Sequence, residues 1–183
     1  MHWSVSIEIF PAGIRSDWSN VIHMTTSGEV DDYGYRTPSV WFSPNSTSLL
    51  IENLDNGFFT DEIPMGKWTN LKIAHQQKNN GSFGYYITVD GKLVHSIPND
   101  VPEHFENVRV YTSNPWLEDS PAAVRNVRIE TYGYGMLALY TRCTIYFLKR
   151  FGVIHATNIK CVKDNFYMTS DHRKIVLVKQ III

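Results

Sequence analysis

Cysteine is scarce in this 183-residue chain, which contains only Cys143 and Cys161. Their spacing fits no disulfide rule, so the sequence leaves a bond between them open. Tryptophan and proline do not occur after Pro121. Acidic residues also become rare: residues 1–135 carry 16 acidic and 9 basic side chains, whereas residues 136–183 carry 2 and 8. This change in composition predicts a domain at 1–135 followed by a basic, apolar tail at 136–183.

The chain also lacks a leader and a long apolar run. Met1 leads directly into an alternating strand pattern, with no basic segment followed by an apolar one. This pattern favours either a cytosolic protein or an incomplete N-terminus. The longest apolar stretch, residues 136–151, is too short to span a bilayer and contains Arg142 and Lys149. We therefore expect no transmembrane span. We also expect no nucleic-acid partner for a chain whose formal net charge is −1.

Alternation of apolar and polar side chains is the strongest structural signal that the sequence contains. Residues 65–95 predict three consecutive antiparallel strands. The middle one, residues 83–89, places Phe, Tyr, Ile and Val on one face, as a strand with one buried side does. Asp90 and Gly91 then predict a two-residue type I′ turn, because both residues tolerate the positive φ that this turn requires.

The same pattern recurs on both sides of this central stretch. Further strands are predicted at residues 3–10, 18–25, 39–43, 48–53, 107–113 and 122–132, with a loop or hairpin at 54–64. No helix is indicated before residue 135. Many short strands separated by turn residues predict an all-β fold, a two-sheet antiparallel jelly-roll sandwich.

The tail at 136–183 admits two interpretations. It could bind a membrane surface or a partner, and residues 136–151 could then form a helix with cations near its C-terminal end, where the helix dipole favours them. It could also be foreign to the domain, since a composition rich in Ile, Lys, Tyr, Phe and Asn is typical of translated A/T-rich non-coding sequence. The sequence leaves the structure of this extension open.

Two motifs connect the chain with a known superfamily. Gly66-Lys67-Trp68 precedes an apolar strand, a polar turn and then residues 86–94, YITVDGKLV. This arrangement resembles the laminin G-like domains of the concanavalin A-like lectin/glucanase superfamily. Residues 105–111 and 124–129 are similar to the closing strands of such domains. The resemblance covers residues 3–132. It implies a two-sheet jelly roll, with an N-terminal partner strand absent from this chain.

The resemblance also implies a role. We expect a non-catalytic, lectin-like recognition module that binds glycans or extracellular matrix and cell-surface proteins through loops at one rim. It would act in cell adhesion, outside the cell, as part of a larger secreted protein. Two alternatives remain: a glycoside hydrolase-like enzyme of the same superfamily, and a purely structural domain. A missing partner strand would leave an unpaired sheet edge, through which the chain could self-associate.

The loop at residues 29–36 contains the candidate metal ligands. Calcium binds several oxygen ligands, and Glu29, Asp31 and Asp32 could supply three of them. Domains like those of the superfamily often hold calcium at a loop rim, so we predict Ca²⁺ as the cofactor. The alternative is a solvated loop, or an ion pair between an aspartate and Arg36.

Aromatic side chains in loops are the candidate ligand-binding groups, because sugar faces stack on flat rings. We predict a ligand-binding set of Tyr33, Tyr35, Arg36 and Trp116. Trp41 and Tyr86 are weaker candidates. We expect the remaining tryptophans, Trp3, Trp18 and Trp68, to be buried.

The sequence contains two glycosylation signatures but no recognisable catalytic motif. A glucanase of this superfamily carries Glu-x-Asp-x-x-Glu on one strand, so that two carboxylates flank the glycosidic bond. This array, a nucleophile elbow and a His-Glu-x-x-His pair are all missing from the sequence. We therefore predict no catalytic residues. Asn45 and Asn80 begin glycosylation signatures, Asn-Ser-Thr and Asn-Gly-Ser, within predicted turns.

Overall fold

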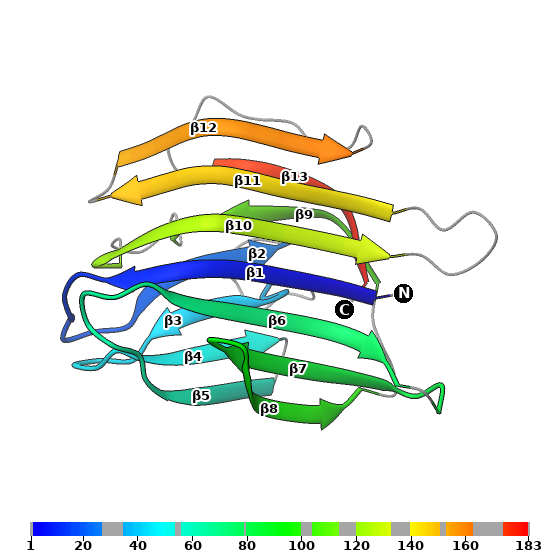
Figure 1. The fold of residues 1–183 in the computed structure, drawn as a ribbon, viewed down its shortest axis with the longest axis horizontal. Coiled ribbons are helices and arrows are strands. Elements are labelled where there is room, and N and C mark those ends of the chain that lie inside the picture. Colours follow the sequence, from blue (N-terminus) through cyan, green and yellow to red (C-terminus); the bar gives the residue numbers. More distant parts are fainter. Residues whose placement is uncertain are drawn as a thin grey trace.

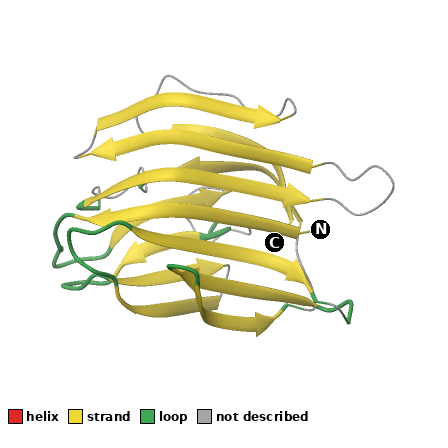
Figure 2. Cartoon of the chain, in the orientation of Figure 1, coloured by secondary structure: helices red, strands yellow, loops and turns green. Residues whose placement is uncertain are grey.

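The chain folds as two layers of strands. The computed structural model describes residues 2–26, 35–53, 56–78, 80–99, 104–113, 120–132, 140–150, 153–162 and 174–182. These residues form strands and loops without a helix (Figure 2). In the described part of the chain no helix could therefore span a membrane. Two antiparallel sheets lie face to face (Figure 1), which confirms the predicted all-β, two-sheet antiparallel sandwich.

One sheet has seven strands in the order β12-β11-β10-β1-β6-β7-β8. Its strands are β1 (His2–Pro11), β6 (Thr69–Gln77), β7 (Phe83–Val89), β8 (Lys92–Pro98), β10 (Ala122–Tyr132), β11 (Tyr140–Arg150) and β12 (Val153–Val162). The other sheet has six strands in the order β13-β9-β2-β3-β4-β5. Its strands are β2 (Ser19–Thr25), β3 (Ser39–Phe42), β4 (Ser48–Asn53), β5 (Asn56–Glu62), β9 (His104–Tyr111) and β13 (Lys174–Ile182). The last three strands, β11 to β13, extend both sheets on the same side of the sandwich (Figure 1).

β1 lies inside the seven-stranded sheet and anchors the core. It pairs with β10 on one edge and with β6 on the other. Its alternate residues Trp3, Val5, Ile7 and Ile9 are buried between the sheets, as the alternation predicts. Burial of one such side chain contributes roughly 1.5–3 kcal/mol. Because both edges of β1 are paired, the unpaired edge expected from a missing partner strand is not found on this strand.

The segment predicted as three strands forms β6, β7 and β8 in consecutive antiparallel pairs. Asp90 and Gly91 connect β7 to β8 with φ values of 48° and 80°. Both values are positive, as the predicted type I′ turn requires. The Asp90 side chain also accepts a hydrogen bond from the backbone N–H of Asn70, at 2.7 Å, and so ties the turn to β6.

The helix considered for residues 136–151 is not found in their described part. Tyr140–Arg150 forms strand β11, which pairs with β10 on one side and β12 on the other. The segment YTRCTIYFLKR is rich in Thr, Ile, Tyr and Phe, which favour strands. The outer edge of β10 also offers unpaired backbone groups that a strand can satisfy and a helix cannot. Of the loop or hairpin expected at 54–64, the structure shows a hairpin, because β5 pairs antiparallel with β4.

The pairing of β11 with β12 brings the two cysteines of the chain into register. Cys143 and Cys161 are direct Cα partners in this antiparallel ladder. Directly opposed residues in such a ladder have Cα atoms about 4.5–5.5 Å apart. A disulfide requires a Cα separation of about 4.4–6.8 Å. The register therefore allows a Cα separation suited to a disulfide, which the sequence spacing alone could not establish.

A polar and aromatic cluster joins β1 to β10 on the outer side of the seven-stranded sheet. Arg125 donates from Nε to Glu8 Oε2 at 2.6 Å, and Asn126 donates from Nδ2 to Glu8 Oε1 at 2.8 Å. The Arg125 guanidinium also lies 3.9 Å from the ring centroid of Trp68. Burial by itself would raise the pKa of Glu8, but these hydrogen bonds and the charge of Arg125 outweigh it and lower that pKa.

The lowered pKa of Glu8 makes part of the stability of the fold dependent on pH. The carboxylate stabilises the fold at neutral pH, and this contribution is lost as pH falls from the unfolded pKa toward the lower folded one. We expect Glu8→Gln to reduce the free energy of unfolding by less than about 1 kcal/mol at neutral pH. Urea titrations at a series of pH values should show that the free energies of unfolding of wild type and variant become equal at acidic pH. A difference that stays constant down to about pH 2 would contradict the assignment.

The opposed cysteines lead us to expect a disulfide in the oxidised protein. Air or glutathione disulfide would take two electrons, and the two thiols would release two protons, as the Cys143–Cys161 bond forms. Alkylation of the unreduced, denatured chain followed by intact mass measurement should show no modified thiol, and two after reduction. Cys143→Ser should leave one alkylatable thiol under both conditions. Two modified thiols in the unreduced, air-exposed wild-type chain would show that the Cys143–Cys161 disulfide does not form.

Candidate functional site

The site begins with β3, whose side chains alternate between the two faces of the six-stranded sheet. Val40 and Phe42 belong to the hydrophobic core. Successive residues of a strand point to opposite faces, so Ser39 and Trp41 lie on the face turned away from the core. We call this face the outer face of the six-stranded sheet. Trp41 is nevertheless only 6% exposed, because neighbouring side chains cover it.

β4 adds a carboxylate to the same face. Leu49 and Ile51 of this strand are buried in the core, so Glu52 points outward. In the antiparallel ladder Glu52 is the direct partner of Ser39 on β3. Directly opposed residues share a face, which places the carboxylate beside the Ser39 hydroxyl.

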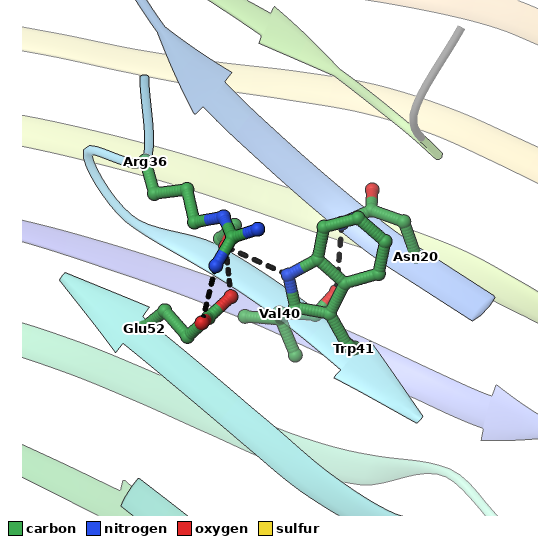
Figure 3. A network of polar contacts seen from close by, with 6 residues as sticks. Asn20, Arg36, Val40, Trp41 and Glu52 are labelled. Carbon is green, nitrogen blue, oxygen red and sulfur yellow. Dashed lines mark hydrogen bonds and ion pairs between the residues drawn. The ribbon is translucent and has the colours of Figure 1, made fainter. Parts of the chain in front are cut away.

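Four side chains on the outer face form a chain of polar contacts, which we call the Trp41 network (Arg36, Ser39, Trp41 and Glu52). The indole Nε1–H of Trp41 donates to Ser39 Oγ at 2.8 Å, and Ser39 Oγ donates to Glu52 Oε2 at 3.3 Å. Arg36 Nη1 donates to Glu52 Oε1 at 2.5 Å, in an ion pair. Figure 3 shows Arg36, Glu52 and Trp41 converging over β3 and β4. Each group fixes the orientation of the next.

The guanidinium of Arg36 contacts two aromatic rings as well as the carboxylate of Glu52. Its Cζ lies 4.8 Å from the ring centroid of Tyr35 and 5.7 Å from that of Trp41. A cation at such a distance is attracted by the electron-rich face of a ring. The side chain of Arg36 is 29% exposed and that of Glu52 is 16% exposed. Both ionic groups are therefore held in place while still reaching the surface.

Asn20 supports Trp41 from β2, at an irregular point of the ladder. The β2–β3 register shifts between Asn20 and Ile22. The side-chain amide of Asn20 spans this shift, donating from Nδ2 to the carbonyls of Ile22 and Val40, both at 3.2 Å (Figure 3). Asn20 is also the ladder partner of Trp41. On the next row the ring of His23 packs edge-on against Trp41, with centroids 6.2 Å apart.

Two exposed rings lie farther along the same sheet. Trp18 precedes β2 and Phe59 is on β5, and their ring centroids are 6.3 Å apart at an interplanar angle of 48°. Trp18 is 39% exposed and Phe59 is 57% exposed. The prediction that Trp18 is buried is therefore wrong. Its neighbour Ser19 pairs with the core residue Phe42, so the alternation turns Trp18 toward the outer face instead.

The structure brings together two of the predicted ligand-binding residues. Tyr35 and Arg36 are in contact with each other beside Trp41. The predicted partners Tyr33 and Trp116 lie outside the described residues, as do the candidate calcium ligands Glu29, Asp31 and Asp32. Within the described residues, no group of three or more His, Cys, Asp or Glu side chains could hold a metal ion.

Sequence reasoning did not find Glu52 or Phe59. Glu52 is 16 positions away from Arg36 in the chain, and only the β3–β4 pairing makes them neighbours. The alternation of β4 did contain a signal, because Glu52 falls on the face opposite Leu49 and Ile51. Tyr86, a weaker candidate, lies on the seven-stranded sheet, where its ring covers Gly84: a Cβ there would be 2.6 Å from the phenol oxygen.

The two glycosylation signatures differ in how much of each is accessible. Asn45 and Asn80 are both exposed. The hydroxyl of Thr47, the third residue of the first signature, is buried and donates to the backbone carbonyl of Ile63 at 2.7 Å. The third residue of the second signature, Ser82, donates from Oγ to Asn80 Oδ1 at 2.8 Å in an exposed turn. Only the second signature presents its hydroxyl at the surface of the folded chain.

This difference predicts the order in which the two asparagines accept a glycan. An oligosaccharyl transferase acting on the folded chain should modify Asn80 and spare Asn45, since the enzyme must reach the hydroxyl of the signature as well as the asparagine. On the denatured chain both should react. Intact mass with Asn45→Gln and Asn80→Gln as references would assign the sites. Equal modification of both asparagines in the folded chain would contradict this prediction.

The outer face of the six-stranded sheet thus combines hydrogen-bond donors, a carboxylate acceptor and accessible rings within one set of adjacent strands. Comparisons of the chain with models of protein families, with curated proteins and with solved structures found no match.

Proposed function

We propose that this chain is a non-catalytic recognition module that binds glycans on the outer face of its six-stranded sheet. The Trp41 network is the observation that carries the proposal. A sugar presents hydroxyl groups that both donate and accept hydrogen bonds, so a site for it needs fixed groups of both kinds. Arg36 supplies donors and Glu52 supplies acceptors, and both reach the surface.

The network has hydrogen-bonding capacity left for a ligand. A guanidinium has five N–H donors and a carboxylate has about four acceptor positions. Among the described residues, the network uses one nitrogen of Arg36 and one contact at each oxygen of Glu52. Because Tyr35, Trp41 and Ser39 already hold these groups in place, a ligand would lose little affinity to ordering them.

The arrangement suits binding better than glycoside hydrolysis. Hydrolysis by the superfamily mechanism needs one carboxylic acid to give a proton while a second carboxylate attacks or activates water. Glu52 instead accepts hydrogen bonds from Arg36 and Ser39, which suits a role as an acceptor. The resemblance of residues 3–132 to laminin G-like domains gives independent support for a recognition role outside the cell, with a glycan or an extracellular protein as the partner.

Glycan-array binding followed by calorimetry tests the proposal. Wild type should bind at least one class of glycan. For the best ligand, Glu52→Gln should weaken the affinity roughly tenfold to a hundredfold, because hydrogen bonds to a charged group contribute about 1.5–3 kcal/mol. Calcium and a chelator should be compared, since calcium dependence would support the predicted ligands Glu29, Asp31 and Asp32.

A neighbouring carboxylate provides the matched control. Glu62 lies on β5 of the same sheet, is exposed and accepts a hydrogen bond from Ser46 Oγ at 2.8 Å. Glu62→Gln should leave the affinity unchanged. The proposal fails if wild type binds no glycan with or without calcium, or if the two variants weaken binding equally. Binding to extracellular proteins alone would instead favour a structural, protein-binding domain.

A further inference from the structure

We propose that Trp18 and Phe59 form a second subsite, which stacks against the face of a sugar ring, so that the ligand is an oligosaccharide rather than a single sugar. This inference rests on the proposed function. It extends the site from the Trp41 network on β3 and β4 to the edge strand β5. The apolar face of the sugar ring would stack on one of the two aromatic rings, and the other ring would border it.

The strand register places the two rings on the same side as the network. Trp41 is the direct partner of Leu50, and Leu50 is the direct partner of Phe59. Directly opposed residues share a face, so these three side chains form one row across β3, β4 and β5. Neighbouring strands are about 4.8 Å apart, and the row from Trp41 to Phe59 therefore spans roughly 10 Å. That span is longer than one sugar ring.

Apolar surface lies between the network and the two rings. Gly57 of β5 is the direct partner of Glu52 and has no side chain. A Cβ at this position would lie 3.9 Å from Glu52 Cγ and 3.2 Å from Leu50 Cδ1. Leu50 therefore covers the place that a side chain at Gly57 would take, next to Glu52. Because Leu50 is also the direct partner of Phe59, it connects the network to the exposed ring by apolar surface.

The properties of the ring pair favour a sugar ring as its occupant. The rings are tilted by 48° relative to each other, so they form an angled surface rather than one flat plane. Asp17 Oδ1 accepts a hydrogen bond from the backbone N–H of Trp18 at 2.7 Å, which fixes Trp18 and places a carboxylate next to it. An apolar surface bordered by a hydroxyl-binding carboxylate matches a pyranose, whose C–H face is ringed by hydroxyl groups.

A series of ligands of increasing length tests the subsite. The ligands are the monosaccharide, disaccharide and trisaccharide that make up the best glycan of the array. Wild type should bind the disaccharide or trisaccharide about five- to tenfold more tightly than the monosaccharide, the gain expected from one ring stacked on aromatic side chains. Phe59→Ala and Trp18→Ala should remove this gain and leave the affinity for the monosaccharide unchanged.

Leu93 provides a matched control, because it is 53% exposed but belongs to β8 of the other sheet. Leu93→Ala should bind all three ligands as wild type does. The tryptophan fluorescence of wild type should change more with the longer ligand than with the monosaccharide, since Trp41 of the network is next to both, and Trp18→Phe should remove this difference. Thermal unfolding would show that the variants fold, since Trp18 and Phe59 are both exposed and lie outside the hydrophobic core.

Several outcomes overturn the inference while leaving the proposed function intact. One is equal affinity of wild type for the monosaccharide and the longer ligands. Another is a loss in Phe59→Ala that is the same for every ligand length. A third is a change in self-association, seen by sedimentation, with unchanged sugar affinity, which would assign the rings to contact with a second copy of the chain. Failure of wild type to bind any sugar would overturn both proposals.

Discussion

Burial of the inner-facing residues of β1 is the interaction on which both sheets depend. This strand pairs with neighbours on both edges and turns Trp3, Val5, Ile7 and Ile9 toward the opposite sheet. The strands β6 and β10 come from distant parts of the sequence and lie in one layer because both pair with β1. The opposite layer is fixed in turn by packing its own core residues, such as Ile22 and Leu49, against this face.

This constraint leaves each sheet an outer face, and the two outer faces differ. On the seven-stranded sheet, Arg125 of β10 contacts both Glu8 of β1 and Trp68, the residue before β6, which is a stabilising arrangement. On the six-stranded sheet, the Trp41 network keeps a guanidinium and a carboxylate at the surface next to a row of apolar and aromatic side chains. This difference is the reason that our proposal assigns the ligand to the outer face of the six-stranded sheet.

The Trp41 network is ordered by contacts between its own members as well as by the sheet. Ser39 connects the indole of Trp41 to Glu52, and Arg36 closes the arrangement by pairing with Glu52 over two rings. Removing one member therefore changes the position of the others. For this reason the conservative change Glu52→Gln, which keeps the shape of the side chain and removes its charge, is more informative about function than a truncation would be.

The sequence by itself determined the class of fold, the strands of residues 65–95 and the turn at Asp90 and Gly91, because alternation and turn chemistry act between residues that are close in the chain. It also singled out Tyr35 and Arg36. It did not indicate Glu52 as their partner, the exposure of Trp18 or the strand β11. The tertiary structure decided these features, because each depends on which strand lies alongside: β3–β4 pairing brings Glu52 to Arg36, and the edge of β10 pairs with residues 140–150, whose structure the sequence had left open.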